Sequence, residues 1–126
     1  MVQRKSDLLQ NILDDFQMRT SDTLIAMVTT KDGLSVASTK KDSIAAEEDA
    51  LAVAASRISE MTSDINNQLN QGEIGRILIE GSDRTTIVSS AGRDTLFIVV
   101  VPADAKLGLT MLAISNAAES IAQVYS

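Results

Sequence analysis

The spacing of hydrophobic residues predicts that the longest helix of the chain runs from Ser43 to Leu69. One set of apolar residues in this segment recurs at spacings of three, four and seven, which places the set on one side of a helix. The set consists of Ile44, Leu51, Ala55, Ile58, Ile65 and Leu69. We expect this apolar stripe to cover a sheet.

Two shorter amphipathic helices are predicted at the ends of the sequence. The first is capped by Ser6 and ends near Thr20, and the last is capped by Asp104. Their apolar stripes consist of Leu8, Leu9, Ile12, Leu13 and Phe16 in the first helix, and of Leu107, Met111, Ile114, Ala118 and Ile121 in the last.

Five strand-like segments lie between the helices. They are Thr23 to Thr30, Leu34 to Ser38, Ile74 to Glu80, Thr85 to Ser90, and Thr95 to Val101. The first and last of these are almost continuously apolar, as is typical of strands that are covered on both faces. The Asp-Gly pair after the first strand predicts a tight hairpin in which both turn residues have positive φ.

The order of these elements predicts an α+β fold, an α/β sandwich with a mostly antiparallel five-stranded sheet. If the two most apolar strands are central neighbours, the strand order is 2-1-5-4-3. The long helix then covers one face, and the two terminal helices cover the other.

This strand order leaves the third strand on an open edge of the sheet. Exposed apolar edges tend to be paired with another strand. We therefore expect the edge to pair with its own copy and to form a homodimer. The predicted dimer edge consists of Ile74, Arg76, Leu78 and Glu80.

A second row on the long helix is small and apolar at its beginning and charged at its end. It consists of Ala46, Ala50, Val53, Arg57, Glu60 and Asp64. Small side chains let another backbone approach closely, so we interpret this row as a docking surface for a partner or for the second helix of a dimer. A plainer explanation is that alanine is the best helix former.

Composition narrows the range of functions. The 126 residues are expected to form a single domain over 1–126, and the net charge of −6 argues against nucleic acid as a partner. The chain has no histidine and no cysteine, which removes the commonest general base, all thiol chemistry and the two softer zinc ligands, and leaves only carboxylates for any metal. We expect a protein that is not an enzyme, with no catalytic residues, no metal and no cofactor. No segment has the pattern of a signal peptide or a membrane span. A cytoplasmic protein without membrane insertion is expected.

Charged side chains are the remaining candidates for a catalytic role. Adjacent carboxylates such as Asp14 and Asp15 diverge around a helix and do not converge on one substrate atom. An arginine can stabilise the transition state of a GTPase when a partner inserts it. Arg57, Arg84 and Arg93 are the candidates, although Arg57 can also pair with Glu60.

The chain as a whole resembles the roadblock/LC7 domain family in its compact prokaryotic form. The resemblance is carried by the first hairpin, from Met27 to Ser38, and by the run from Leu96 to Leu109, which leads into the last helix. It implies a profilin/longin-like fold and a homodimer joined through the third strands, with the long helices side by side. It also implies that the partner is a small Ras-like GTPase, which the dimer regulates or scaffolds.

Two other functions remain open at this stage. One is a ligand-sensing module of the PAS or GAF kind, which shares the strand order but needs a pocket. The other is an adaptor subunit of a larger complex without a GTPase. Since the sequence ends at Ser126, directly after the last helix, we expect no contact through a terminal extension.

Overall fold

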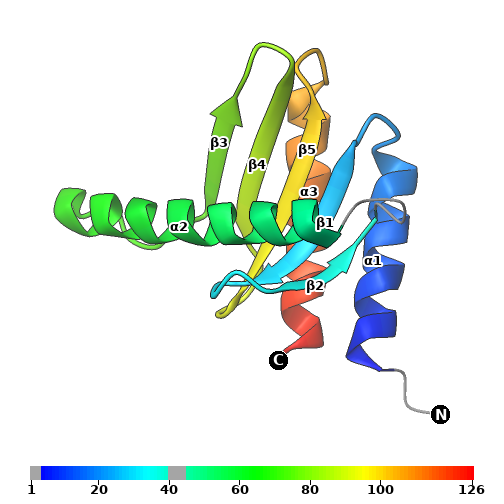
Figure 1. Cartoon of the computed structure of the whole chain (residues 1–126), viewed down its shortest axis with the longest axis horizontal. Coiled ribbons are helices and arrows are strands. Elements are labelled where there is room, and N and C mark those ends of the chain that lie inside the picture. The colour runs from blue at the N-terminus through cyan, green and yellow to red at the C-terminus, as the bar shows by residue number, and fades with distance from the viewer. Residues whose placement is uncertain (1–3, 40–44) are drawn as a thin grey trace.

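A five-stranded antiparallel sheet lies between two layers of helices in the computed structural model, which describes residues 4–39 and 45–126. The strand order is β2-β1-β5-β4-β3, as predicted. Helix α2 lies on one face of the sheet, and α1 and α3 lie on the other (Figure 1). The elements are α1 (Lys5–Arg19), β1 (Ile25–Thr30), β2 (Ser35–Ser38), α2 (Ala45–Leu69), β3 (Arg76–Glu80), β4 (Arg84–Ser90), β5 (Thr95–Pro102) and α3 (Leu107–Val124).

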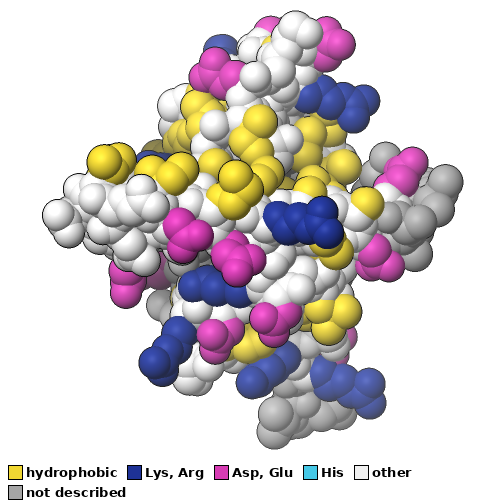
Figure 2. Space-filling model, turned by 60° about the vertical axis from the view of Figure 1, so that its left-hand side comes forward, with side chains coloured by type: hydrophobic (Ala, Val, Ile, Leu, Met, Phe, Trp, Pro, Cys, Tyr) yellow, Lys and Arg dark blue, Asp and Glu magenta, His cyan; other side chains and the backbone are white. Residues whose placement is uncertain are grey.

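Helix α2 crosses the strands, and its carboxyl-terminal part projects beyond β3 (Figure 1). On the face of the molecule seen in Figure 2, hydrophobic side chains gather across the middle and upper part, and charged side chains are more frequent below. Among the described side chains of α2 none is buried beyond Ser59, so the rest of the helix is not held closely against the sheet of its own chain.

The contact between α2 and the sheet is built from small residues. Ala52 and Ala55 are buried there and pack in a cluster with Met27, Val88, Leu96 and Ile98. A side chain on Gly33, in the β1–β2 turn, would place its Cβ 3.3 Å from the Cα of Val53. The Ser56 hydroxyl donates a hydrogen bond to the Lys31 carbonyl at 2.5 Å. Small side chains and one polar contact thus fix the first half of α2 against the hairpin.

The predicted apolar stripe of this helix is correct in its first half and wrong in its second. Ala55 is buried as expected, but Ile65 and Leu69 are 52% and 60% exposed. Ser59, which is polar, is buried in their place. The helix is rotated relative to the prediction because Ala52 and Ser59 let it approach the sheet. Ser43 and Ile44 lie outside the described residues.

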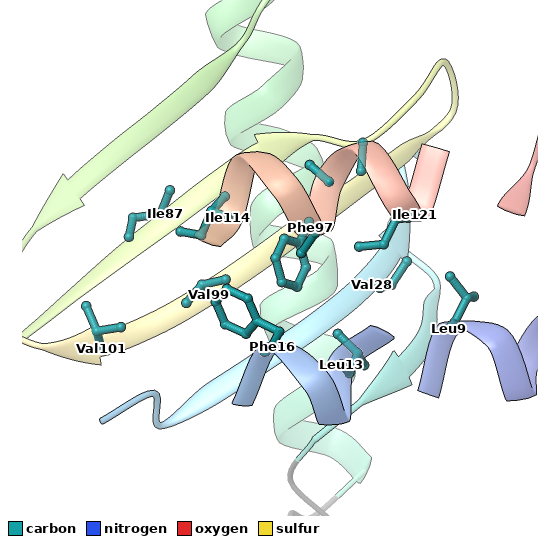
Figure 3. Packing of buried hydrophobic residues seen from close by; sticks show 14 residues of the cluster. Leu9, Leu13, Phe16, Val28, Ile87, Phe97, Val99, Val101, Ile114 and Ile121 are labelled. Carbon is teal, nitrogen blue, oxygen red and sulfur yellow. The ribbon is translucent and has the colours of Figure 1, made fainter. Parts of the chain in front are cut away.

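The larger hydrophobic core lies between the sheet and helices α1 and α3. Phe16 of α1 and Phe97 of β5 pack edge to face at its centre, with ring centroids 5.1 Å apart (Figure 3). Leu9 and Leu13 of α1 and Ile114 of α3 are also fully buried in this core. Side chains of the chain itself therefore fill the layer between this face of the sheet and its helices.

Both predicted amino-terminal caps are wrong. Helix α1 begins at Lys5 with Arg4 at the N-cap, so Ser6 lies inside the helix. Helix α3 has Lys106 rather than Asp104 at its N-cap. Neither cap residue makes a side-chain hydrogen bond to its helix. Buried apolar contacts on both helices, rather than capping, account for where they form.

The turn after β1 also differs from the prediction, and α2 ends at a left-handed residue that is not a glycine. That residue is Asn70, with φ 56°. In the β1–β2 turn only Gly33 has positive φ, so Asp32 does not adopt the predicted conformation. The loop has three residues, and the Thr30 amide closes it by donating to the Leu34 carbonyl at 2.9 Å.

Candidate interaction surfaces

Strand β3 is the open edge that the sequence predicts. It pairs with β4 in a regular antiparallel ladder. Its register with β4 pairs Arg76 with Ser89 and Glu80 with Thr85, without interruption. The Gly81 amide bonds the Arg84 carbonyl, and the Ser90 amide bonds the Gly75 carbonyl. In an antiparallel ladder hydrogen-bonded and non-hydrogen-bonded pairs alternate. The amides and carbonyls of Arg76, Leu78 and Glu80 therefore point outward from the sheet.

The side chains of β3 divide between the two faces of the sheet. Ile77 packs against the cluster beneath α2, so its neighbour Leu78 points to the α3 side. The Arg76 guanidinium reaches α3, where it donates to the Ser115 hydroxyl at 3.3 Å. Leu78 and Ile79 are 42% and 40% exposed. Hydrophobic side chains are thus uncovered on both faces of this edge.

Ile74 was predicted to belong to the same strand, and the structure corrects this. β3 begins at Arg76, and Ile74 precedes it in the connection from α2. Gly75 separates the two residues and still accepts the last hydrogen bond from β4. The edge strand is therefore formed by Arg76, Leu78 and Glu80 together with the two isoleucines between them.

The predicted docking row lies on the side of α2 that faces away from the sheet. Ala50, Val53, Arg57, Glu60 and Asp64 are all exposed. Arg57 makes no ion pair with Glu60 among the described residues, so the alternative explanation for this arginine is not supported. The side chain of Ala46 lies outside the described part of the chain.

A third surface was missed by sequence reasoning. Met61, Ile65 and Leu69 are all more than half exposed and repeat at a spacing of four, so they form one row along a flank of α2. Met61 was not singled out, and the other two residues were assigned to the core. The signal was present in the sequence, because an apolar row that continues beyond the reach of its own sheet needs another surface to cover it.

The acidic side chains and arginines of residues 4–39 and 45–126 are spread over several elements. No group of three or more Asp or Glu side chains there is placed to hold a metal ion. Arg84 begins β4 and Arg93 lies in the β4–β5 turn, so the structure does not bring either of them to the outer face of α2 with Arg57. The helices of the described chain include none that is long and apolar enough to cross a bilayer.

The layers and strand order define an α/β/α sandwich of the profilin-like class. The fold matches Acanthamoeba castellanii profilin II with a TM-score of 0.64 at 14% sequence identity, over 94% of this chain and 99% of that one. The Roadblock/LC7 domain model matches residues 9–101, and the chain therefore belongs to the Roadblock/LC7 family.

Solved structures of bacterial proteins resemble the whole chain more strongly. Myxococcus xanthus MglB superposes with a TM-score of 0.88 at 14% identity, covering 99% of this chain and 92% of that one. The gliding protein MglB from Thermus thermophilus gives a TM-score of 0.86 at 18% identity, covering 98% and 93%. No curated protein matches the sequence. At these identities the likeness concerns the fold.

Proposed function

We propose that this protein is a homodimeric regulator or scaffold that binds a small Ras-like GTPase and is not itself an enzyme. The proposal is carried by one observation. Helix α2 leaves two of its sides uncovered, one polar and one apolar, beside a strand edge whose hydrogen-bonding groups are unpaired. Family membership supports the same function, because the resemblance implies a GTPase as the partner.

In the proposed dimer, a twofold axis lies beside the outward edge of β3 and brings the β3 strands of two chains together. Two such edges pair antiparallel and extend the sheet across both chains. The projecting part of each α2 then lies over the sheet of the other chain, where Ile79 is exposed on the same face. Met61, Ile65 and Leu69 become covered by this arrangement. Each chain supplies the apolar surface that the other lacks, which is the self-complementarity that an isologous contact needs.

The GTPase contact is assigned to the outer face of the paired α2 helices. Ala50, Val53 and Arg57 face away from the sheet, so dimer formation through β3 leaves them accessible. Arg57 is the residue there whose charge can stabilise the phosphates during hydrolysis. The protein can also act without such a residue, by ordering the switch loops of the GTPase itself.

The test combines light scattering after size-exclusion chromatography with a GTP hydrolysis assay, using a small Ras-like GTPase from the same organism. Binding with faster hydrolysis makes the protein an activator, and binding without acceleration makes it a scaffold. Absence of a complex with both the GDP- and GTP-bound forms contradicts the proposal and favours the adaptor function. Light scattering also reports assembly beyond a dimer, which matters because one related structure is described as MglB with a tetrameric arrangement.

The role of Arg57 is tested separately. If it stabilises the transition state, Arg57→Ala lowers stimulated hydrolysis by about a thousandfold, at the lower end of the range for such arginines, while binding is retained. Arg84→Ala is the matched control, since it removes the same charge at the start of β4. Equal effects of the two substitutions would show that net charge, rather than a specific arginine, is responsible.

A further inference from the structure

A polar cleft of about 750 Å³ lies between the second half of α2 and the ends of two hairpins. Ser59, Ser63 and Asn67 of α2 form one wall. Lys31 from the β1–β2 turn and Arg93 from the β4–β5 turn supply its cations. A volume of this size falls within the range of small-molecule sites, roughly 300–1,000 Å³.

Backbone contacts hold the cationic turns in place. The Lys31 amide donates to the Asp94 carbonyl at 2.9 Å, which ties the two turns together. The Lys31 carbonyl accepts the Ser56 hydroxyl, which ties them to α2. Leu96, at the start of β5, lines the cleft and is buried. The cleft is therefore built on the sheet and the helix rather than on loops alone.

The charge of the cleft is opposite to that of the chain. The protein carries a net charge of −6, whereas the cleft is lined by two cations and one acid, Glu73. The side chains of Lys31, Glu73 and Arg93 make no ion pair or hydrogen bond within the described residues. Two unpaired cations that line one concave surface attract an anion.

The wall of the cleft offers hydrogen-bonding groups that the protein does not use. The side chains of Ser59, Ser63 and Asn67 make no hydrogen bond to the described part of the chain, although Ser59 is buried. Behind the cleft, Thr29 pairs with Leu96 across the sheet, and its hydroxyl is buried without a partner. Buried polar groups are usually satisfied, so the Thr29 hydroxyl is an exception next to this cleft, while the exposed Ser63 and Asn67 side chains are free to bond a ligand.

The cleft stays open when the proposed dimer forms. Its α2 residues are Ser59, Ser63 and Asn67, and each lies two positions before a member of the apolar row Met61, Ile65 and Leu69. Two positions along a helix correspond to about 200° of rotation, so the two rows occupy opposite flanks. A ligand in the cleft and a second chain at the apolar row do not compete.

We propose that this cleft binds a small phosphate-bearing molecule. The phosphate lies between Lys31 and Arg93, because these side chains are the usual phosphate ligands and neither has another partner. The rest of the molecule carries hydroxyl groups that bond to Ser63 and Asn67 on the helix wall. This site does not depend on the GTPase contact, which is assigned to a different side of α2.

The test is a titration of the full chain with inorganic phosphate, followed by NMR of the backbone amides at constant ionic strength. We expect saturable shifts at Lys31, Arg93 and Ser63, and weakening of binding by about tenfold for Lys31→Gln and for Arg93→Gln. Arg84→Gln is the matched control and leaves the affinity unchanged. Thermal melting verifies that the variants fold, which is expected because both cations are exposed.

Three results would overturn the proposal. The first is the absence of saturable shifts at these amides. The second is equal weakening by the Arg84 control, which would indicate general charge screening. The third is that a glutamate-rich peptide binds at the cleft while phosphate does not, which would make it a contact for an acidic protein segment.

Discussion

The two edges of the sheet differ in how well they are protected. β2 has four residues, its pairing with β1 is interrupted between Val28 and Thr29, and Ala37 packs into the core beside α1. β3 pairs with β4 in continuous register and leaves apolar side chains exposed on both faces. Irregular, covered edges resist pairing, whereas regular, exposed edges invite it. The same sheet thus has one short, irregular edge and one longer, regular edge.

The largest effect is expected when the open edge loses a backbone donor. Leu78 directs its amide outward, so Leu78→Pro removes a donor that the proposed dimer uses between its two chains and leaves the β3–β4 ladder intact. We expect the mass measured by light scattering to fall from dimer to monomer. Leu78→Ala, which keeps the amide, should remain largely dimeric. A dimeric proline variant would restrict the contact to the helices.

The apolar flank of α2 should be almost as sensitive. Ile65→Glu places a carboxylate where the second chain is expected to cover it, at a cost of about 3 kcal/mol, so the dimer Kd should rise by about a hundredfold. Sedimentation equilibrium measures this change. Ser63→Glu adds the same charge on the opposite flank and should leave the dimer Kd unchanged. If both variants dissociate equally, the flank assignment is wrong.

A third substitution acts at the protected edge and alters stability rather than assembly. Gly33 has φ +94°, and its Cβ would meet the backbone of α2. Gly33→Ala should therefore lower the free energy of unfolding by about 1–2 kcal/mol, measured by urea denaturation. Gly108→Ala is the control, because nothing lies within 4 Å of that position and alanine favours the helix. The dimer mass of both variants should stay unchanged.

The smallest effect is expected on the exposed side chain of β2. Val36 is partly exposed on this edge, and Val36→Lys should change the free energy of unfolding by no more than about 0.5 kcal/mol. Light scattering should again show a dimer. A monomeric Val36→Lys protein would contradict the prediction, because it would indicate that the dimer contact lies at β2 rather than at β3.

The comparison also shows what the sequence could predict. Strand order followed from the continuous apolar runs around Met27 and Ile98, because a strand buried on both faces has to be central. Ile65 and Leu69 were misassigned for a related reason. Hydrophobic spacing places residues on one side of a helix, but it does not show how far along the helix that side is covered by the sheet of its own chain. Ser59 escaped notice because a small polar residue carries no periodic signal.

The polar cleft was beyond the reach of sequence reasoning for another reason. Lys31, Ser63 and Arg93 come from three separate elements and have no spacing in common. Only the fold brings them together, through a turn-to-turn hydrogen bond that no local pattern encodes. The prediction that Asp104 caps the last helix failed for a similar reason. Residues that can cap a helix also occur at positions where the backbone does not use them as caps.

The projecting half of α2 has a consequence for the lifetime of the protein in the cell. In the proposed dimer the projecting half of α2 packs against the second chain. A single chain lacks that support, and local opening of such a segment exposes cleavable backbone. Unpaired copies should then be degraded faster than paired ones. The abundance of the protein would in this way adjust itself to the amount that has assembled, without any separate regulator.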